Sequence, residues 1–202
     1  MFRFNCISCG KCCIKFGGKG LPLFDFEVEK ARRLAGNKKL NVLPTEIFLD
    51  KKSGKKFAVL YGLFEEPCPF LEDKKCSIYK ERFLICGQFP LFCSAEFKFA
   101  KIAGLPEFME CKNFDCTKNF SEFLGKETKS LKEIQDYLAE VYGSCFEGCL
   151  KSNKETDYIM NELLEMEKQG KIDLESVDYR TGGKGQKVMS LKEFLQYKQA
   201  YK

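Results

Sequence analysis

The spacing of apolar residues along the chain predicts several amphipathic helices. Within residues 25–35, apolar positions recur every three or four residues, which is the period of one helix face. Asp25 is suited to cap the start of this helix and Gly36 to end it. The same spacing predicts three further helices, over residues 128–149, 155–169 and 190–200.

Shorter apolar runs predict strands in the first half of the chain. The run at 57–61 follows a turn-like Lys-Ser-Gly-Lys segment, so we expect a hairpin that joins residues 47–50 to 57–62. Residues 96–102 alternate between apolar and polar and predict another strand. Together these elements predict an α+β fold, with a loop-rich, cysteine-rich domain over 1–120 and a helical region over 121–202 packed against it.

Cysteine usage indicates the chemistry. The chain has twelve Cys and no His in 202 residues, and four of the thiols fall between Cys6 and Cys13. Thiolates are soft ligands that favour zinc and iron–sulfur centres, and a C-x2-C-x2-C run can wrap three sulfurs around one inorganic core. The absence of His argues against a hydrolytic zinc centre and against histidine as a general base.

A second dense segment surrounds Cys68, whose two proline neighbours restrict its backbone. The sequence Asp73-Lys74-Lys75 predicts a turn that places Cys68 and Cys76 on two arms of one bend. Cys145 and Cys149 continue the apolar face of the predicted helix 128–149, which favours core packing over metal binding. The ten stronger candidate metal ligands are Cys6, Cys9, Cys12, Cys13, Cys68, Cys76, Cys86, Cys93, Cys111 and Cys116.

The formal charge of +5 treats every cysteine as neutral, and thiolate ligands would offset it. The lysines are spread along the chain without stacking aromatics, so we expect no nucleic-acid partner. No apolar stretch precedes the first cysteines, and no run reaches membrane-spanning length. We therefore expect a cytoplasmic protein in a reducing compartment, where such cysteines indicate metal or catalysis rather than disulfides.

Four motifs, in this order, resemble the CxxCxxCC group of zinc- or iron-chelating proteins, also called YkgJ-like cysteine cluster proteins. They are Phe4-x-Cys6-x2-Cys9-Gly10-x-Cys12-Cys13, Pro67-Cys68-Pro69-Phe70-Leu71, Cys76-Ser77-Ile78-Tyr79-x2-Arg82 and Cys86-x2-Phe89-Pro90. The resemblance covers about residues 4–93 and departs at Phe83, where the group usually has proline, and at Gly87, where it usually has arginine. It implies a metal-binding cysteine domain whose ligand set is completed by Cys93, Cys111 or Cys116.

Neighbouring side chains point in different directions unless the chain turns tightly, so two sites can share the motif. In one such arrangement Cys6, Cys9 and Cys12 hold the first site with a remote thiol. The second site would then consist of Cys13, Cys68, Cys76 and Cys86. Cys145 and Cys149 are the alternative ligands of a further cluster with Cys111 and Cys116.

The triple cysteine run and its scattered partners favour one or more iron–sulfur clusters of the 4Fe-4S type, with Zn²⁺ as the alternative. A group related to this family includes the flagellin lysine methylase, so the resemblance implies either a redox role with a redox partner or methyl transfer to a protein substrate. For methyl transfer, Glu65, Glu66 or Asp73 would orient the substrate lysine. The competing hypothesis is a structural zinc module that mediates protein interactions through its helical C-terminal region.

Overall fold

The computed structural model of the chain describes residues 3–6, 10–14, 20–92, 107–108, 115–125, 129–178 and 187–200. It mixes helices with short, mainly antiparallel strands, and its C-terminal region is mostly helical, so the predicted α+β class is confirmed. Cys9, Cys93, Cys111 and the predicted strand 96–102 lie outside the described residues.

The chain forms two compact units, each built from two separate stretches of sequence. Unit 1 consists of Met1–Ile7 and Arg82–Asp157, and unit 2 consists of Ser8–Glu81 and Tyr158–Lys202. This partition differs from the predicted division at residue 120. The reason is that two C-terminal strands pair with strands from the first third of the chain, which no local pattern indicates.

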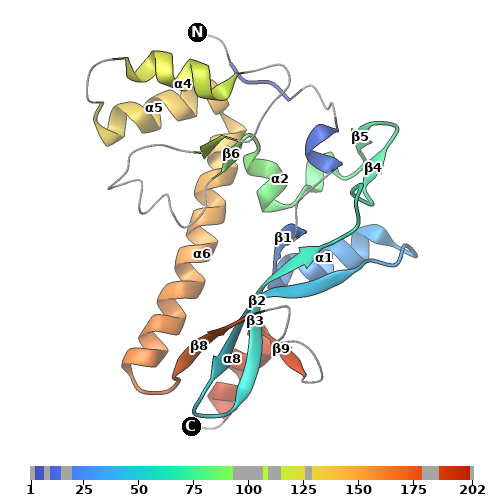
Figure 1. Cartoon of the computed structure of the whole chain (residues 1–202), viewed down its shortest axis with the longest axis vertical. Helices are drawn as coiled ribbons and strands as arrows, with labels where there is room; N and C mark the ends of the chain where they lie inside the picture. The colour runs from blue at the N-terminus through green and yellow to red at the C-terminus, as the bar shows by residue number, and fades with distance from the viewer. Residues whose placement is uncertain are drawn as a thin grey trace. The chain divides into compact units, whose positions relative to one another are not determined.

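Unit 2 contains a sheet whose centre is the hairpin of β2 (Val42–Asp50) and β3 (Lys55–Leu63) (Figure 1). The predicted hairpin is therefore confirmed. β1 (Leu21–Phe24) pairs antiparallel with β3, and β8 (Leu174–Val177) pairs antiparallel with β2. β9 (Val188–Ser190) pairs with β3 in parallel.

Helices cover this sheet. α1 (Asp25–Ala35) has the predicted bounds and ends at Gly36, although Phe24 rather than Asp25 occupies the N-cap position. α8 (Leu191–Ala200) confirms the last predicted helix, and its Phe194 ring stacks on Phe57 of β3 with the ring centroids 3.9 Å apart. The core of the unit is completed by Val59, Leu163, Ile172 and Leu191.

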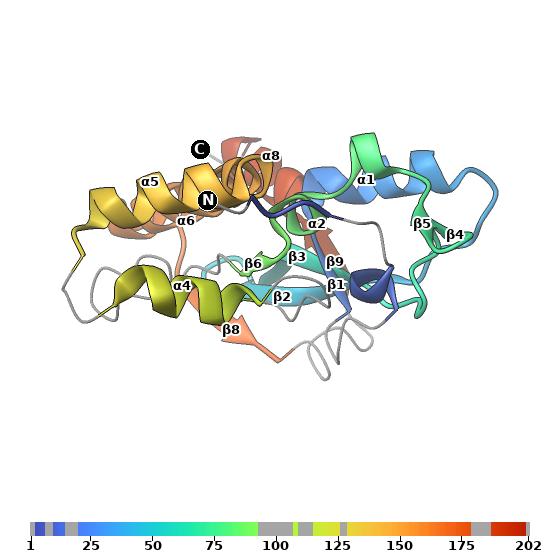
Figure 2. The ribbon, with the colours of Figure 1, turned by 90° about the horizontal axis from the view of Figure 1, so that it is seen from above.

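Unit 1 is mainly helical within its described part. Its elements are α2 (Leu84–Gln88), β6 (Leu91–Phe92), β7 (Glu107–Phe108), α4 (Cys116–Leu124), α5 (Leu131–Tyr142) and the first part of α6 (Ser144–Lys168). α4 and α5 run beside one another (Figure 2), with the Phe123 and Tyr137 rings stacked at 4.0 Å.

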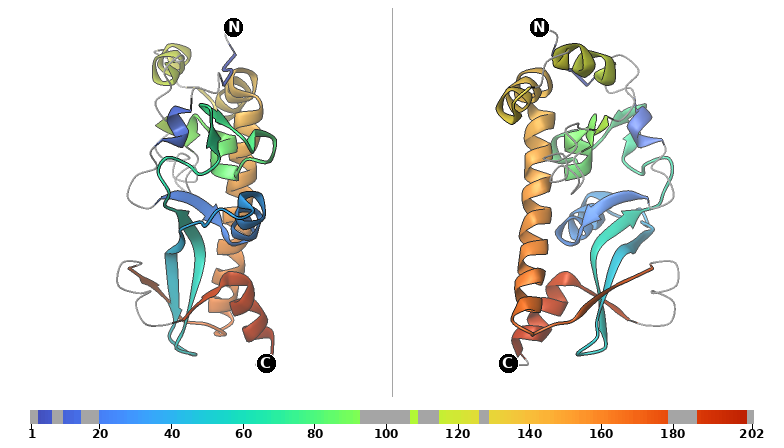
Figure 3. Two further views of the ribbon diagram at one scale, coloured as in Figure 1. Left: turned by 90° about the vertical axis from the view of Figure 1, so that its right-hand side faces the viewer. Right: turned by 60° about the vertical axis from the view of Figure 1, so that its left-hand side comes forward.

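The predicted helices 128–149 and 155–169 are wrong in their boundaries. Ser130 caps α5 as expected from its sequence, and its side chain accepts a hydrogen bond from the Glu133 backbone. α5 then ends at Gly143, whose φ of 46° lies in the left-handed region that interrupts a helix. α6 begins at the next residue and continues to Lys168 as one helix (Figure 3). No described helix is both long enough and apolar enough to cross a membrane.

The backbones of α2 and α6 approach closely in unit 1. A Cβ atom built on Gly148 of α6 would lie 2.9 Å from the backbone carbonyl carbon and oxygen of Gly87 in α2. A Cβ atom on Gly87 would meet nothing closer than the Arg82 Nε atom, at 3.9 Å. The contact therefore requires glycine at 148 and tolerates a side chain at 87.

We expect Gly148→Ala to destabilise unit 1 by about 1–3 kcal/mol, because the added methyl group overpacks a backbone contact. In an unconstrained helix the same change would stabilise by about 1 kcal/mol. The direction of the change in unfolding free energy therefore shows whether the close backbone contact is present. Gly87→Ala is the matched control and should be neutral or stabilising. Chemical denaturation checks both variants, and a Gly148→Ala protein at least as stable as the wild type would contradict the packing.

Asp50 joins three elements of unit 2. The carboxylate is fully buried, pairs with Lys198 of α8 at 2.7 Å, and accepts hydrogen bonds from Ser53 and from the Asp173 backbone before β8. Burial alone would raise the pKa of Asp50, but the hydrogen bonds from Lys198, Ser53 and Asp173 lower it below its ordinary value.

Asp50→Asn should lower the free energy of unfolding by about 3–5 kcal/mol at neutral pH, because it leaves Lys198 without its buried partner. Because the pKa of Asp50 is lower in the folded protein than in the unfolded chain, where it is about 3.9, the ionised carboxylate stabilises the folded state above about pH 3.9. This stabilisation is lost as the pH falls through the folded-state pKa. The stability difference between wild type and variant should therefore shrink below about pH 4. Denaturation at several pH values measures it, and a difference independent of pH would refute this role of Asp50.

Candidate metal centres

The cysteine-rich motif contains a tight turn. Gly10 has a φ of 72°, and the short helix η1 (Lys11–Cys13) follows it with the Cys13 amide donating to the Gly10 carbonyl at 2.9 Å. This turn brings the Cys12 and Cys13 sulfur atoms to 3.9 Å from each other. The side chains of the adjacent cysteines therefore lie close together, and the predicted arrangement that divides them between two sites stays a prediction.

The second cysteine segment packs against this turn. The Cys68 amide donates to the Cys13 carbonyl at 2.7 Å, and a Cβ atom on Gly10 would lie 3.3 Å from the Lys74 carbonyl oxygen. β4 (Leu71–Glu72) and β5 (Lys75–Cys76) form a hairpin in which Leu71 pairs with Cys76. The predicted turn at residues 73–75 is therefore present between Cys68 and Cys76.

Four cysteines of unit 2 form one group, which we call the unit 2 thiol group: Cys12, Cys13, Cys68 and Cys76. Cys68 is buried, and burial raises the pKa of its thiol. Negative charge on Cys76, Cys12 and Glu65 would raise this pKa further, so these groups lie within electrostatic range of Cys68. Several thiolates so close together would repel one another, and a cation among them would remove that repulsion.

Glu65 lies next to this group. One of its carboxylate oxygens accepts a hydrogen bond from the Asn41 amide. The other oxygen, Oε2, is buried and has no hydrogen-bond partner among the described residues. Asp73 lies in the β4–β5 turn and is exposed, as is Glu66. The predicted role of these three acidic residues in orienting a substrate lysine stays a prediction.

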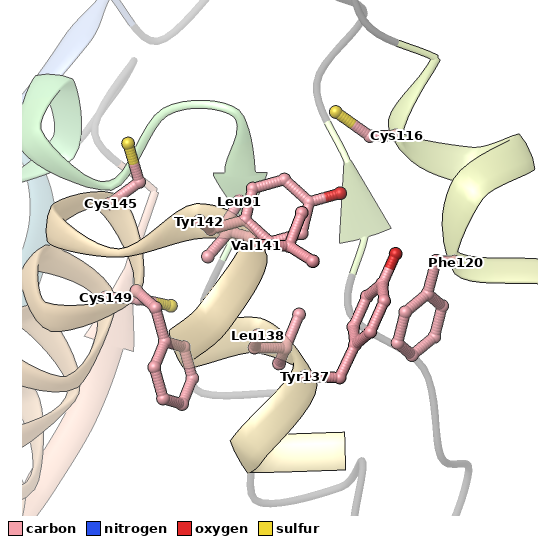
Figure 4. Close-up of a cluster of buried hydrophobic side chains, with 10 residues drawn as sticks. Leu91, Cys116, Phe120, Tyr137, Leu138, Val141, Tyr142, Cys145 and Cys149 are labelled. Carbon is pink, nitrogen blue, oxygen red and sulfur yellow. The ribbon is translucent and has the colours of Figure 1, made fainter. Parts of the chain in front are cut away.

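The other described cysteines belong to unit 1: Cys6, Cys86, Cys116, Cys145 and Cys149. Cys116 and Cys145 are buried in an apolar cluster with aromatic side chains of α4 and α5 (Figure 4). Cys116 lies near the Tyr142 hydroxyl, and burial, followed by Cys116, raises the pKa of Tyr142. Cys149 is disulfide-bonded, and a disulfide sulfur is not available as a thiolate ligand.

Cys145 has a charged neighbour that the predicted ligand set did not include. Burial raises the pKa of Cys145, while the Arg82 guanidinium, which donates a hydrogen bond to the sulfur, lowers it. Cys6 is close enough to raise this pKa. Arg82 belongs to one of the four motifs, so the sequence itself drew attention to it. Its contact with Cys145, which lies 63 residues later, could not be predicted from any local pattern.

The cysteines of the unit 2 thiol group lie near one another, but the part of the chain that the structure describes contains no closed metal site. Among those residues, no three His, Cys, Asp or Glu side chains already lie close enough to hold a metal ion. Metal binding by the unit 2 thiol group would therefore draw its sulfur atoms closer together or recruit further cysteines. Which of the predicted cysteines are ligands stays a prediction.

Comparison with known proteins supports the metal chemistry. Residues 5–117 match a family model named CxxCxxCC and described as "Putative zinc- or iron-chelating domain". Neither the curated proteins nor the solved structures contain a match to the chain. The matched region contains the whole unit 2 thiol group and covers just over half of the 202 residues. The chain therefore belongs to the CxxCxxCC family of zinc- or iron-chelating domains.

Proposed function

We propose that the unit 2 thiol group binds a single metal ion, zinc in the first instance, and that this ion holds the cysteine-rich segments of unit 2 together. The observation that carries the proposal is the 3.9 Å separation of the Cys12 and Cys13 sulfur atoms. In a tetrahedral zinc site with Zn–S bonds of about 2.3 Å, the sulfurs are about 3.8 Å apart. The pair is thus spaced as two ligands of one ion.

The surrounding residues fit a bound cation. Cys12 and Cys13 lie on a turn locked by Gly10, and Cys68 is tied to that turn by its backbone hydrogen bond to Cys13. The buried Oε2 atom of Glu65, which has no donor among the described residues, adds negative charge beside Cys68. The metal would supply the positive charge that lets these groups pack together, and its binding free energy would become folding free energy.

An iron–sulfur protein in a redox or methyl-transfer role is the second candidate. It is favoured by the apolar surroundings of Cys116 and Cys145, where rings such as Phe120, Tyr137 and Tyr142 exclude water. An apolar shell that excludes water is one means by which a protein tunes the reduction potential of an iron–sulfur cluster. In this role the protein would need a redox partner or a protein substrate.

Anaerobic purification followed by quantification of zinc, iron and acid-labile sulfide tests the proposal. We expect a zinc ion that Cys68→Ser releases, together with loss of stability in the wild type when a strong chelator is added. Replacing the zinc by cobalt(II) should produce an intense thiolate-to-cobalt charge-transfer band and the visible bands of a tetrahedral site.

Cys116→Ser is the matched control, because it alters an equally buried cysteine in unit 1 and should leave the unit 2 metal in place. A brown protein, with broad absorption near 400 nm that dithionite bleaches and that Cys68→Ser abolishes, would replace the zinc proposal by the iron–sulfur candidate. Full metal content in Cys68→Ser would reject the unit 2 thiol group as a metal site.

A further inference from the structure

We propose that Lys38 is a positioning residue for the unit 2 thiol group, because it holds in place the segment that carries Cys68 and Cys76. The inference rests on the metal site proposed for unit 2 and adds to it a residue that is not itself a ligand. Lys38 lies in the connection between α1 and β2, outside the four cysteine motifs. The spacing of the cysteines therefore gives no indication of it.

The Lys38 ammonium group joins two points of the cysteine segment. Its Nζ atom donates a hydrogen bond to the Pro69 carbonyl at 3.1 Å and pairs with the Glu72 carboxylate at 2.9 Å. Pro69 directly follows Cys68 in the chain. Glu72 lies in β4, which pairs with the strand that carries Cys76. An exposed ion pair alone stabilises little, but here the same cation also binds a backbone carbonyl next to a cysteine.

The backbone around Lys38 is itself hydrogen-bonded. The Lys38 amide donates to the Ala35 carbonyl at 3.0 Å, in the turn that ends α1. Three residues later, the Asn41 amide donates to the Glu65 carboxylate, and the Asn41 carbonyl accepts a hydrogen bond from the Phe64 amide at 3.0 Å. Lys38 therefore reaches the cysteine segment from a connection that is held at both ends.

The contacts of Lys38 are linked to the cysteines through one turn. The Leu71 amide donates to the Cys68 carbonyl at 2.9 Å, and the Pro69 carbonyl lies within the turn that this bond closes. A shift of the turn would displace Cys68 from the Cys13 carbonyl, to which its amide donates at 2.7 Å. Metal ligands bind best when neighbouring contacts already hold them in place, so loss of Lys38 should weaken metal binding.

Two measurements on the full-length chain test the inference. One is the dissociation constant for cobalt(II), and the other is the rate at which iodoacetamide alkylates Cys68 in the reduced, metal-free protein, followed by mass spectrometry. Lys38→Met should raise both by about 3- to 10-fold, because it removes a hydrogen bond and an ion pair that restrain the turn. Alkylation of a buried thiol requires local opening of the structure, so its rate reports on this turn.

Three further variants separate positioning from general stability. Lys38→Arg keeps a cation with several donors and should restore both values toward those of the wild type. Lys51→Met is the matched control and should change neither value, because the Lys51–Glu175 pair is similarly exposed and joins β2 to β8, which carry no cysteine. Lys38→Met/Glu72→Gln should bind cobalt no more weakly than Lys38→Met, since both changes remove the same contact.

The inference is overturned if Lys38→Met leaves either value at that of the wild type, or if Lys51→Met gives the same change. It is also overturned if Lys38→Arg behaves like Lys38→Met, or if the effect of Glu72→Gln adds in full to that of Lys38→Met. Failure of the unit 2 metal proposal is a separate outcome, in which the wild type and Cys68→Ser bind the same amount of cobalt. The alkylation rate then decides alone whether Lys38 positions the cysteine segment.

Discussion

The feature on which the proposed metal centre depends is the close packing of cysteine sulfur atoms in unit 2. The turn at Gly10 places two cysteine sulfurs 3.9 Å apart, and a third cysteine is hydrogen-bonded through its backbone to the same turn. If these groups are ionised, they can remain together only with a cation among them. The strands β4 and β5 are only two residues long each, and under our proposal the bound metal stabilises the geometry of this hairpin.

Local signals predicted those elements that local interactions determine. The bounds of α1, the cap at Ser130 and the β2–β3 hairpin follow from helix-ending, capping and turn residues whose partners are near in sequence. The break at Gly143 was missed because the apolar stripe of α5 continues in phase into α6, and only the positive φ of the glycine separates the two helices. The pairing of β8 and β9 with β2 and β3 joins residues more than 120 positions apart, which no periodicity reveals.

The same distinction applies to the metal centres. The cysteines stand out in the sequence because of their density, and the ordered motifs identified the family that the comparison confirms. How the cysteines are grouped depends on the backbone. Adjacent cysteines in an extended chain would diverge, whereas in the turn at η1 they converge, so Cys12 and Cys13 enter one group. Cys6 belongs to unit 1, and the nearby Phe4 is hydrogen-bonded to α5, which lies well over one hundred residues away in sequence. A contact over that separation cannot be predicted from local sequence.

X-ray absorption spectroscopy of the metal-loaded protein tests the central claim most directly, since it reports the ligands and neighbours of the metal without reference to activity. The account predicts that the metal bound by Cys12, Cys13, Cys68 and Cys76 has a first shell of sulfur at about 2.3 Å and no second metal in its vicinity. A metal–metal scattering path that disappears in Cys68→Ser, or a first shell without sulfur, would contradict it.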